Sequence, residues 1–479
     1  MRKSIKINAL LNVTKQIMQV IFPIITVPYI TRVLLPENYG KINFGNSIIN
    51  YIMLIAGLGI SSYAIREGSL IRNKRKDFNL FCNQVFSINI ASTIVAYVIL
   101  AFLLVFVPYF KEYRLLLIIQ SMAVLFTTIG ADWINTIEED YLYLTVRYII
   151  LHIISLILMF VLVKEPEDYY LYAVIALVTS VGANALNIIY IRRYVKLRIT
   201  FDIDWSRHML PIMILFSNAI AMTIYVSSDI TMLGIFKGDT EVGIYSVSTK
   251  IYSVIKQILN AIVIVAIPRL TAYIGTNRLE EYGKLGEKVL SALITLMCPL
   301  VAGIMVFRNE AVFLAGGSEY LSGATSLLIL TMAIVSSLIA TFFSGCVLMP
   351  LRREKYILKG TVIAALINVF LNCLFIPFMG SDGAAITTLI SETYVAICFV
   401  YLAKKEDIHL FNIRVLLLSI VGCIAVTGIS IVMKTYMGSF WLYIGLSVIT
   451  STIVYGAIQF IGKNHVFLEV LHFFPKKDK

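Results

Sequence analysis

The sequence predicts an all-α membrane protein that crosses the bilayer about fourteen times. Of its 479 residues, 59% are hydrophobic and only 14% are charged, and the mean hydropathy is +0.86. These values exclude a water-soluble globule of this size. Many uncharged runs exceed the roughly 17 residues that a bilayer core requires. Because lipid offers the backbone no hydrogen-bond partners, and because the period-two pattern of a membrane barrel is absent, these runs should be helices.

The predicted spans follow one another with short polar connections. The first, at 10–31, is too long for a signal-peptide core and has no cleavage site after it, so we expect it to remain as an anchor. An even number of spans places both termini on one side. The remaining spans are expected at 42–64, 83–107, 115–135, 143–163, 169–191, 209–235, 242–267, 287–306, 322–347, 358–378, 383–402, 414–433 and 440–461.

The connecting loops carry a strong charge asymmetry. Loops on the side of the N-terminus hold 28 Lys and Arg, whereas the opposite loops hold 8. This bias predicts that both termini lie in the cytoplasm. The net charge of +12 is therefore interpreted as a topology signal and not as a sign of nucleic-acid binding.

A weak internal repeat relates the first six spans to the next six. Residues 173–193 match positions 211 residues later, including Ala173 with Ala384, Ser180 with Ser391 and Tyr190 with Tyr401. Parallel repeats of this kind place the binding site of a transporter between the halves. We therefore expect an N-terminal lobe at 1–200, a C-terminal lobe at 201–405, and two added helices with a cytoplasmic tail at 406–479.

A polar elbow separates the first two spans. Pro36 is expected to stop one helix and Gly40 to let the chain turn before the next begins. In that second helix Asn43, Asn46 and Asn50 recur at spacings of three and four, along one face. An unpaired amide in hydrocarbon costs on the order of a few kcal/mol, so this stripe should face protein or a water-filled cavity.

The elbow also carries a longer motif. It reads R-x-L-x-P-E-x-Y-G-x-x-x-F from Arg32, followed by GLGI at 57–60 and YA-x-RE at 63–67. This pattern resembles the Wzx-type polysaccharide-unit flippases, which belong to the superfamily of multidrug, oligosaccharidyl-lipid and polysaccharide exporters. The resemblance implies a bacterial cytoplasmic-membrane protein that moves undecaprenyl-pyrophosphate-linked oligosaccharide to the outer leaflet by alternating access. It also implies a polysaccharide polymerase and a chain-length regulator as partners, and no nucleic acid.

Basic residues within the spans predict a cationic cavity suited to phosphate. Lys250 lies near mid-bilayer, where an ammonium costs several kcal/mol unless it is hydrated or paired. Following the resemblance, the lysines would hold the pyrophosphate and the amides would bind sugar hydroxyls. Related lipid II flippases use several arginines in the first two spans, whereas here the first span offers Lys15 alone. The candidate substrate ligands are Lys15, Gln19, Arg32, Asn43, Asn46, Asn50, Arg66, Lys250, Tyr252, Lys256 and Asn260.

Alternative roles stay open for several of these charges. Lys15 lies close enough to the cytoplasmic interface to extend its ammonium there, and Lys250 could form a buried pair with Asp229. Asp229 could instead bind a coupling cation, and Glu392 is a second intramembrane acid of this kind. We expect no cofactor, with transport coupled to a proton or sodium gradient or to the membrane potential.

The sequence offers little support for an enzyme. No G-x-x-x-x-G-K-[ST] loop occurs, so ATP is not the direct fuel. The pair Asp202 and Asp204 resembles the metal-binding motif of sugar transferases but lies in a loop too short for a nucleotide-binding domain. His and Cys show no metal-ligand spacing. The alternatives are a cation-coupled multidrug exporter, which would favour an acidic cavity, and a membrane component of a polysaccharide synthase, which would need a catalytic loop.

Overall fold

The computed structural model describes residues 5–406 and 410–473, and within them all regular secondary structure is helical. The two chain ends, predicted to lie in the cytoplasm, are outside the described residues. Contacts divide the chain into two compact units. The first comprises residues 1–246 and 315–319, and the second comprises residues 247–314 and 320–479.

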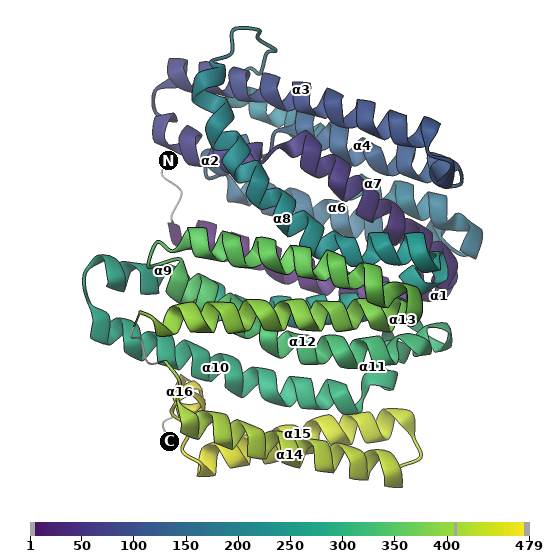
Figure 1. Ribbon diagram of the computed structural model, residues 1–479, viewed down its shortest axis with the longest axis vertical. Helices are drawn as coiled ribbons and strands as arrows, with labels where there is room; N and C mark the ends of the chain where they lie inside the picture. The colour runs from purple at the N-terminus through teal and green to yellow at the C-terminus, as the bar shows by residue number, and fades with distance from the viewer. Residues whose placement is uncertain (1–4, 407–409, 474–479) are drawn as a thin grey trace. The chain divides into compact units, whose positions relative to one another are not determined.

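The first unit is a bundle of helices around α1, which packs against α3, α4, α6 and α8. Its helices appear in purple to teal in Figure 1. They are α1 (Ile5–Gly57), α2 (Ile60–Ile71), α3 (Arg75–Phe106), α4 (Arg114–Gly130), α5 (Trp133–Ile137), α6 (Tyr141–Leu162), α7 (Tyr169–Tyr190) and α8 (Trp205–Lys237), with short 3-10 turns η1 (Pro108–Lys111), η2 (Pro166–Asp168) and η3 (Ile191–Arg193).

The second unit begins within α9 (Asp239–Gly275) and is dominated by two helix pairs, α12 with α13 and α14 with α15. Its apolar helices pack on each other through small and aliphatic side chains. The other elements are α10 (Leu279–Val306), α11 (Arg308–Gly316), η4 (Ser318–Gly323), α12 (Ala324–Phe342), η5 (Phe343–Leu348), α13 (Glu354–Lys404), α14 (Ile413–Tyr436), α15 (Phe440–Ile461) and α16 (His465–Phe473).

The number of helices is compatible with the fourteen predicted spans. Eleven helices in the described part of the chain are long and apolar enough to cross a membrane, and α4 is a shorter apolar helix of 17 residues. Two of these eleven helices each consist of two helical segments. A non-helical residue divides α1 at Leu35 and α13 at Gly380. The chain is thus a multi-pass membrane protein, while the exact count of fourteen stays a prediction.

The elbow differs in detail from the prediction. The chain turns at Leu35, whose φ of 61° and ψ of 169° lie outside the helical region, and Pro36 then begins the second half of α1. Gly40 lies within that helix, so its predicted role as the turning residue is wrong. The predicted span at 42–64 is also interrupted, because Leu58 and Gly59 have positive φ and separate α1 from α2.

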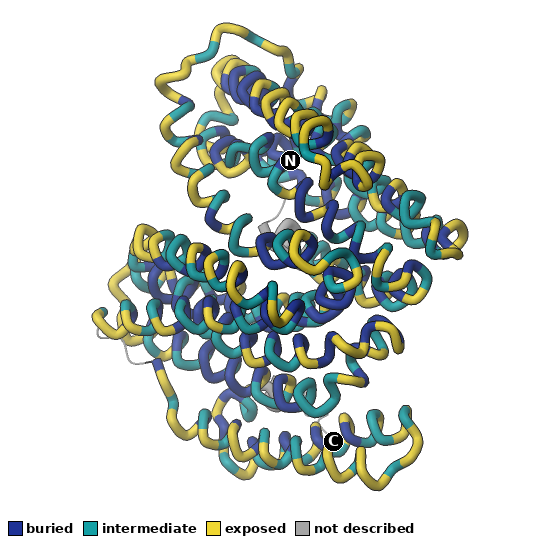
Figure 2. The backbone as a smooth tube through the Cα atoms, turned by 45° about the vertical axis from the view of Figure 1, so that its right-hand side comes forward, coloured by how far each residue is buried: buried dark blue, intermediate teal, exposed yellow. Residues whose placement is uncertain are grey.

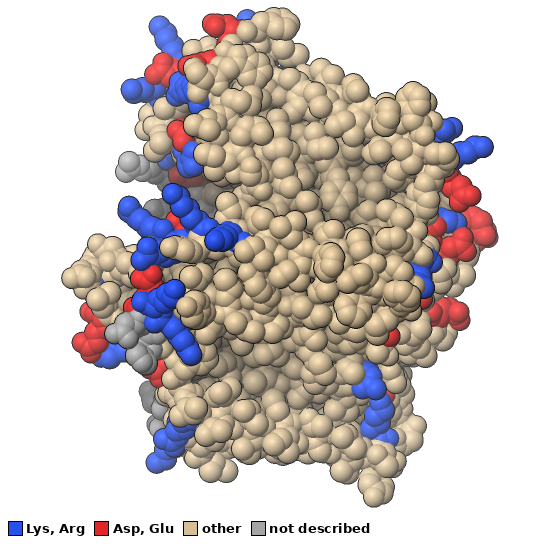
Figure 3. Space-filling model, viewed as in Figure 1, with Lys and Arg blue, Asp and Glu red and all other residues tan. Residues whose placement is uncertain are grey.

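Side chains are distributed as expected for helices in a bilayer. Buried residues line the helix sides that face neighbours within a unit, and exposed residues line the outer sides (Figure 2). Charged side chains gather at helix ends, with a broad face of other residues between them (Figure 3). The contacts also place α8 with the first unit, because it packs on α1 and α2. The compact units are therefore not the lobes 1–200 and 201–405, which stay a prediction about the repeat.

Candidate functional site

Lys256 on α9 forms an ion pair with Glu392 on α13. Its Nζ lies 3.0 Å from Glu392 Oε1, and Tyr252, one turn before Lys256, donates to the same oxygen over 3.1 Å. The Glu392 side chain is only 7% exposed, whereas that of Lys256 is 31% exposed. A buried carboxylate needs both a cation and hydrogen-bond donors. Glu392 therefore balances Lys256, and this pair adds no net charge to the spans.

Lys250 is different, because it is exposed and forms no hydrogen bond or ion pair with any described residue. It lies eleven residues into α9, roughly 16 Å from the start of the helix and about half the depth of a hydrocarbon core. The pairing with Asp229, which belongs to the first unit, stays a prediction. An unpaired ammonium at this depth requires water or an anion beside it.

The amide stripe of α1 is partly free. Asn43 donates to the carbonyl oxygen of Tyr39 over 2.7 Å, one turn earlier. Asn46 and Asn50, by contrast, are exposed and have no partner among the described residues, and Gln19 in the first half of α1 is exposed in the same way. Free amides on a membrane-spanning helix can bind hydroxyl groups of a ligand, since each offers both donors and an acceptor.

Asp229 on α8 belongs to a polar cluster within the first unit. Tyr245 donates to its Oδ2 over 3.1 Å, and Asp229 itself is 8% exposed. Nearby, Thr231 of α8 donates to Ser47 of α1 over 2.9 Å. These bonds connect α1, α8 and the start of α9.

The remaining candidate residues lie apart from one another. Lys15 lies 5.7 Å from the centre of the Tyr148 ring on α6, a cation–π geometry. Arg32 is exposed and donates to the carbonyl oxygen of Pro28, whereas Arg66 pairs with the adjacent Glu67 at 3.0 Å. Asn260, one turn beyond Lys256, has a buried Oδ1 without a hydrogen-bond partner. The candidate residues thus belong to both compact units, with Lys15, Arg32 and Arg66 in the first and Asn260 in the second.

Two helix joints lie against each other in the first unit. The first, at Leu35, connects the two halves of α1, and the second, at Gly238, connects α8 to α9. A Cβ atom on Gly40 would overlap the carbonyl oxygen of Asp239, and one on Gly243 would overlap the carbonyl oxygen of Pro36. Tyr113, directly before α4, donates to Asp239 Oδ1 over 2.7 Å and so holds the start of α9, next to the second joint. Only glycine permits backbones to approach this closely.

An apolar cavity of about 590 Å³ lies in the second unit. It is formed by α10, α11, α14, α15 and α16, and Leu300, Phe307, Val426, Val448 and Phe467 are among its lining residues. Among its few polar residues, the Tyr455 hydroxyl donates to the carbonyl oxygen of Thr295 over 2.7 Å, whereas the Ser447 and Ser451 hydroxyls have no hydrogen-bond partner among the described residues. A cavity of this character suits a hydrocarbon chain.

Comparison with protein families gives a decisive match. The family described as "Polysaccharide biosynthesis protein" matches residues 5–274, which is more than half of the chain. The chain belongs to this family.

Two proteins of similar sequence match over most of the chain. The "Putative O-antigen transporter" of Escherichia coli (strain K12) is 22% identical over 379 residues, which cover 78% of this chain and 91% of that protein. The "Capsular polysaccharide biosynthesis protein CapF" of Staphylococcus aureus is 23% identical over 386 residues, which cover 78% and 93%.

A solved structure confirms the fold. The structure named "Lipid II flippase MurJ, inward closed conformation" superimposes with a TM-score of 0.72 at 13% identity, and the match covers 97% of this chain and 100% of that one. At this identity the similarity concerns the fold alone. It confirms the predicted all-α architecture of many membrane-spanning helices.

Sequence reasoning missed several polar contacts. It treated Lys256 as a substrate ligand and Glu392 as an isolated acid, although 136 residues apart they form one pair. No local signal links them, beyond the general rule that an acid and a base within spans tend to pair. Arg147 and Asp132 form a second ion pair, at 2.7 Å.

Proposed function

We propose that this chain is a flippase that moves undecaprenyl-pyrophosphate-linked oligosaccharide repeat units across the bacterial cytoplasmic membrane. The product would supply capsule or O-antigen-type polysaccharide. Membership of the polysaccharide biosynthesis protein family, the names of the relatives and the fold shared with a lipid II flippase support this proposal. The chain is a membrane transporter and not an enzyme.

The free ammonium of Lys250 carries the substrate assignment. It is a cation on a membrane-spanning helix, exposed and without a partner among the described residues. A drug exporter for lipophilic cations would be repelled by such a group, whereas a pyrophosphate would neutralise it. Lys256 contributes less, because Glu392 already balances its charge.

Other polar groups would bind the rest of the substrate head group. Asn46 and Asn50, which are exposed and have no partner among the described residues, would hydrogen-bond sugar hydroxyls, and Gln19 and Asn43 would contribute further amides. The lipid tail would stay in hydrocarbon, and the apolar cavity of the second unit is suited to it. The proposed substrate ligands also include Lys15, Arg32, Arg66, Tyr252, Lys256 and Asn260.

The transport cycle would follow alternating access of the two predicted lobes. We propose that both termini lie in the cytoplasm and that an ion gradient or the membrane potential drives the cycle, with Asp229 and Glu392 as candidate coupling or charge-balancing groups. A polymerase and a chain-length regulator would act on the product. Single cysteines at Asn73 and Lys164, in a chain without its native cysteines, test the orientation. Asn73 should react with an impermeant thiol reagent only in inverted vesicles, and Lys164 only in intact spheroplasts.

The experiment on function combines a deletion with three variants. Deleting the gene should stop surface polysaccharide and cause lipid-linked repeat units to accumulate on the cytoplasmic face, without sensitising cells to cationic dyes. Lys250→Gln should lower output strongly, because a charge-assisted contact contributes roughly 1.5 to 3 kcal/mol, about ten- to hundredfold in affinity. Lys250→Arg should retain more activity, and Lys237→Gln, which removes an exposed charge at the end of α8, should behave as wild type.

Two outcomes would contradict this function. Wild-type surface polysaccharide from Lys250→Gln, at equal protein level, would remove Lys250 from the substrate site. Dye sensitivity of the deletion strain with normal polysaccharide would instead favour a multidrug exporter.

A further inference from the structure

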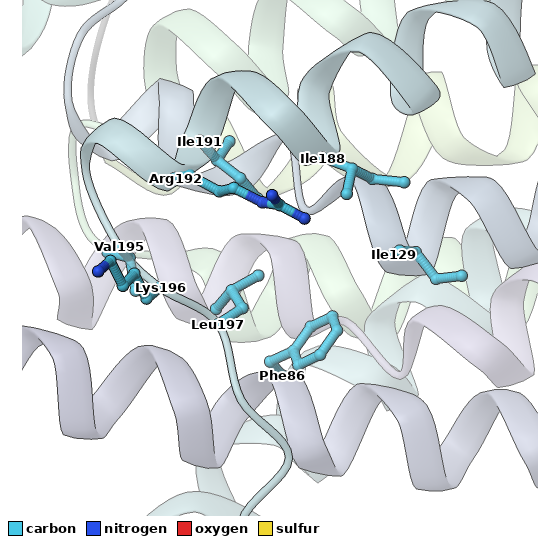
Figure 4. Close-up of a pocket in the computed structure, with 8 residues that line it drawn as sticks. All are labelled: Phe86, Ile129, Ile188, Ile191, Arg192, Val195, Lys196 and Leu197. Carbon is cyan, nitrogen blue, oxygen red and sulfur yellow. The ribbon is translucent and has the colours of Figure 1, made fainter.

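A second cavity lies in the first unit, away from the candidate substrate ligands. It measures about 430 Å³ and is formed where α3, α4 and the end of α7 meet the segment that follows η3 (Figure 4). Its walls are apolar, with Phe86, Ile129 and Ile188 among the lining residues. Two cations, Arg192 and Lys196, also line it, and in Figure 4 the Arg192 side chain extends toward Ile188.

The two cations are free. Arg192 and Lys196 are exposed, and neither forms a hydrogen bond or ion pair with a described residue. The neighbouring Arg193 is different, because it is bound by Asp140 and by the Tyr194 hydroxyl. The chain thus satisfies one cation of this segment internally and leaves two in the lining of an apolar cavity.

The apolar surface continues along the same two helices. A further cavity of about 400 Å³ is lined by residues of α3 from Ile90 to Ala101 and by Leu125 of α4. Ile90 lies one turn after Phe86 on α3, and Leu125 lies one turn before Ile129 on α4, so the two cavities occupy successive turns. From Phe86 to Ala101 the rise is roughly 22 Å, more than the depth of one leaflet's hydrocarbon.

The part of the groove along α3 is apolar, and several of its side chains are exposed. Its polar atoms are satisfied within the protein, since the Tyr97 hydroxyl donates to the carbonyl oxygen of Ser121 over 2.7 Å and Thr93 bonds Thr128 at the same distance. Ile94 and Val98 are 59% and 64% exposed on a membrane-spanning helix. The surface is therefore accessible from the bilayer and offers no hydrogen bonds along its length.

We propose that this groove binds an anionic phospholipid, with its phosphate between Arg192 and Lys196 and one acyl chain along α3 and α4. A free anion would use the cations but leave the apolar groove unfilled. A neutral lipid would fill the groove but leave the cations unpaired. Basic residues beside spans attract anionic lipids on the side where Lys and Arg gather, which for the loop at 192–208 is the predicted cytoplasmic side. Two such contacts favour the anionic over a zwitterionic lipid by roughly tenfold or more.

Native mass spectrometry of the full chain in detergent can count bound lipids one at a time. The probes are phosphatidylglycerol and phosphatidylcholine with identical palmitoyl and oleoyl chains. The head-group variant is Arg192→Gln with Lys196→Gln. Its matched control is Arg198→Gln with Lys76→Gln, which removes two other exposed cations without a side-chain partner. The chain variant is Ala101→Trp, which fills the lower end of the groove at an exposed position.

We expect wild type to bind its first phosphatidylglycerol roughly tenfold more tightly than phosphatidylcholine. The head-group variant should lose this preference, and the control should keep it. Ala101→Trp should weaken both lipids but keep the preference, and phosphatidylglycerol with six-carbon chains should bind wild type weakly. These measurements need no transport assay, so their failure would leave the proposed function intact.

Three outcomes would overturn the proposal. The first is an equal affinity for phosphatidylglycerol in wild type and the head-group variant. The second is displacement of phosphatidylglycerol by millimolar inorganic phosphate without any effect of Ala101→Trp, which would indicate a plain anion site. The third is much tighter binding of undecaprenyl phosphate, lost in the same head-group variant, which would assign the groove to the carrier lipid of the proposed substrate.

Discussion

Gly40 and Gly243 occupy equivalent places in two helix joints, and each lies against the backbone of the other joint. The likeness extends further. Leu35 and Gly238 both have positive φ and extended ψ, at 61° and 169° for Leu35 and at 85° and −177° for Gly238. The same separation of 203 residues relates Leu35 to Gly238 and Gly40 to Gly243. The two joints thus share a backbone conformation, and the glycine of each joint packs against the backbone of the other.

Alanine at either glycine should disrupt this contact. Gly40→Ala and Gly243→Ala each place a methyl group on a carbonyl oxygen, so the joints must separate, at a cost of about 1 to 3 kcal/mol or more. We expect a lower melting temperature in detergent for each variant, measured by size-exclusion after heating. Gly57→Ala in the same helix is the control, because a methyl group there meets nothing within 4 Å. An unchanged melting temperature for both joint variants would show that the contact is dispensable.

Substitutions at Leu35 and Gly238 that exchange leucine and glycine should change the melting temperature in opposite directions. The backbone conformation that they share is essentially restricted to glycine and costs another residue about 1 to 3 kcal/mol. Leu35→Gly should therefore raise the melting temperature, despite the entropy that glycine adds to the unfolded chain. Gly238→Leu should lower it. A destabilised Leu35→Gly variant would mean that the exposed Leu35 side chain contributes more through packing than its backbone costs.

The ion pair of Lys256 and Glu392 predicts an asymmetric mutational effect. Lys256→Gln leaves a carboxylate whose side chain is 7% exposed without a cation, and breaking such a buried pair costs about 3 to 5 kcal/mol. Glu392→Gln should cost less, since the lysine side chain is 31% exposed and can be hydrated. The double variant should recover much of the loss, and a thermal-stability double-mutant cycle measures the coupling. Additive losses would show that the two charges do not interact.

Glu310 on α11 predicts a pH-dependent stability in the second unit. Burial raises the pKa of its carboxyl, but the Lys434 ammonium at 2.7 Å and the Tyr443 hydroxyl at 2.9 Å together hold it below its ordinary value. A lowered pKa in the folded state stabilises the protein above the unfolded value of about 4.3 and loses this effect as the pH falls through the folded value.

Glu310→Gln should therefore lower the melting temperature at pH 7, and the difference from wild type should shrink as the pH falls below about 4. Glu112→Gln, at an exposed carboxylate without a partner among the described residues, is the control. A difference between wild type and Glu310→Gln that stays constant as the pH falls from 7 to well below 4 would contradict the assignment.

Local sequence was sufficient for the architecture. Hydropathy predicted the helices, and Pro36 located the joint to within one residue of Leu35. The predicted role of Gly40 was wrong, because a glycine after a proline is typical of a turn. Here Gly40 instead allows the backbone to approach that of Asp239, almost 200 residues away. Such a role depends on a tertiary partner that local spacing does not reveal.

The candidate site was predictable in residue types but not in pairings. Polar residues at helical spacing identified Asn46, Asn50 and Lys250 as groups in need of partners, and these three are free in the described structure. Which lysine is neutralised could not be predicted, because Lys250 and Lys256 look equivalent in the sequence. The ion pair with Glu392 of α13 distinguishes them, because it neutralises Lys256.

The conformation of Leu35 gives the two joints different energetics despite their similar shape. A rearrangement that returns Leu35 to ordinary extended backbone releases about 1 to 3 kcal/mol, a five- to hundredfold shift in equilibrium, whereas the same change at Gly238 releases almost nothing. A symmetric pair of hinges would move in either order with equal ease. The strain at Leu35 therefore lowers the free-energy cost of rearranging the N-terminal joint relative to the joint at Gly238, so the two joints differ in stability although their backbone shapes agree.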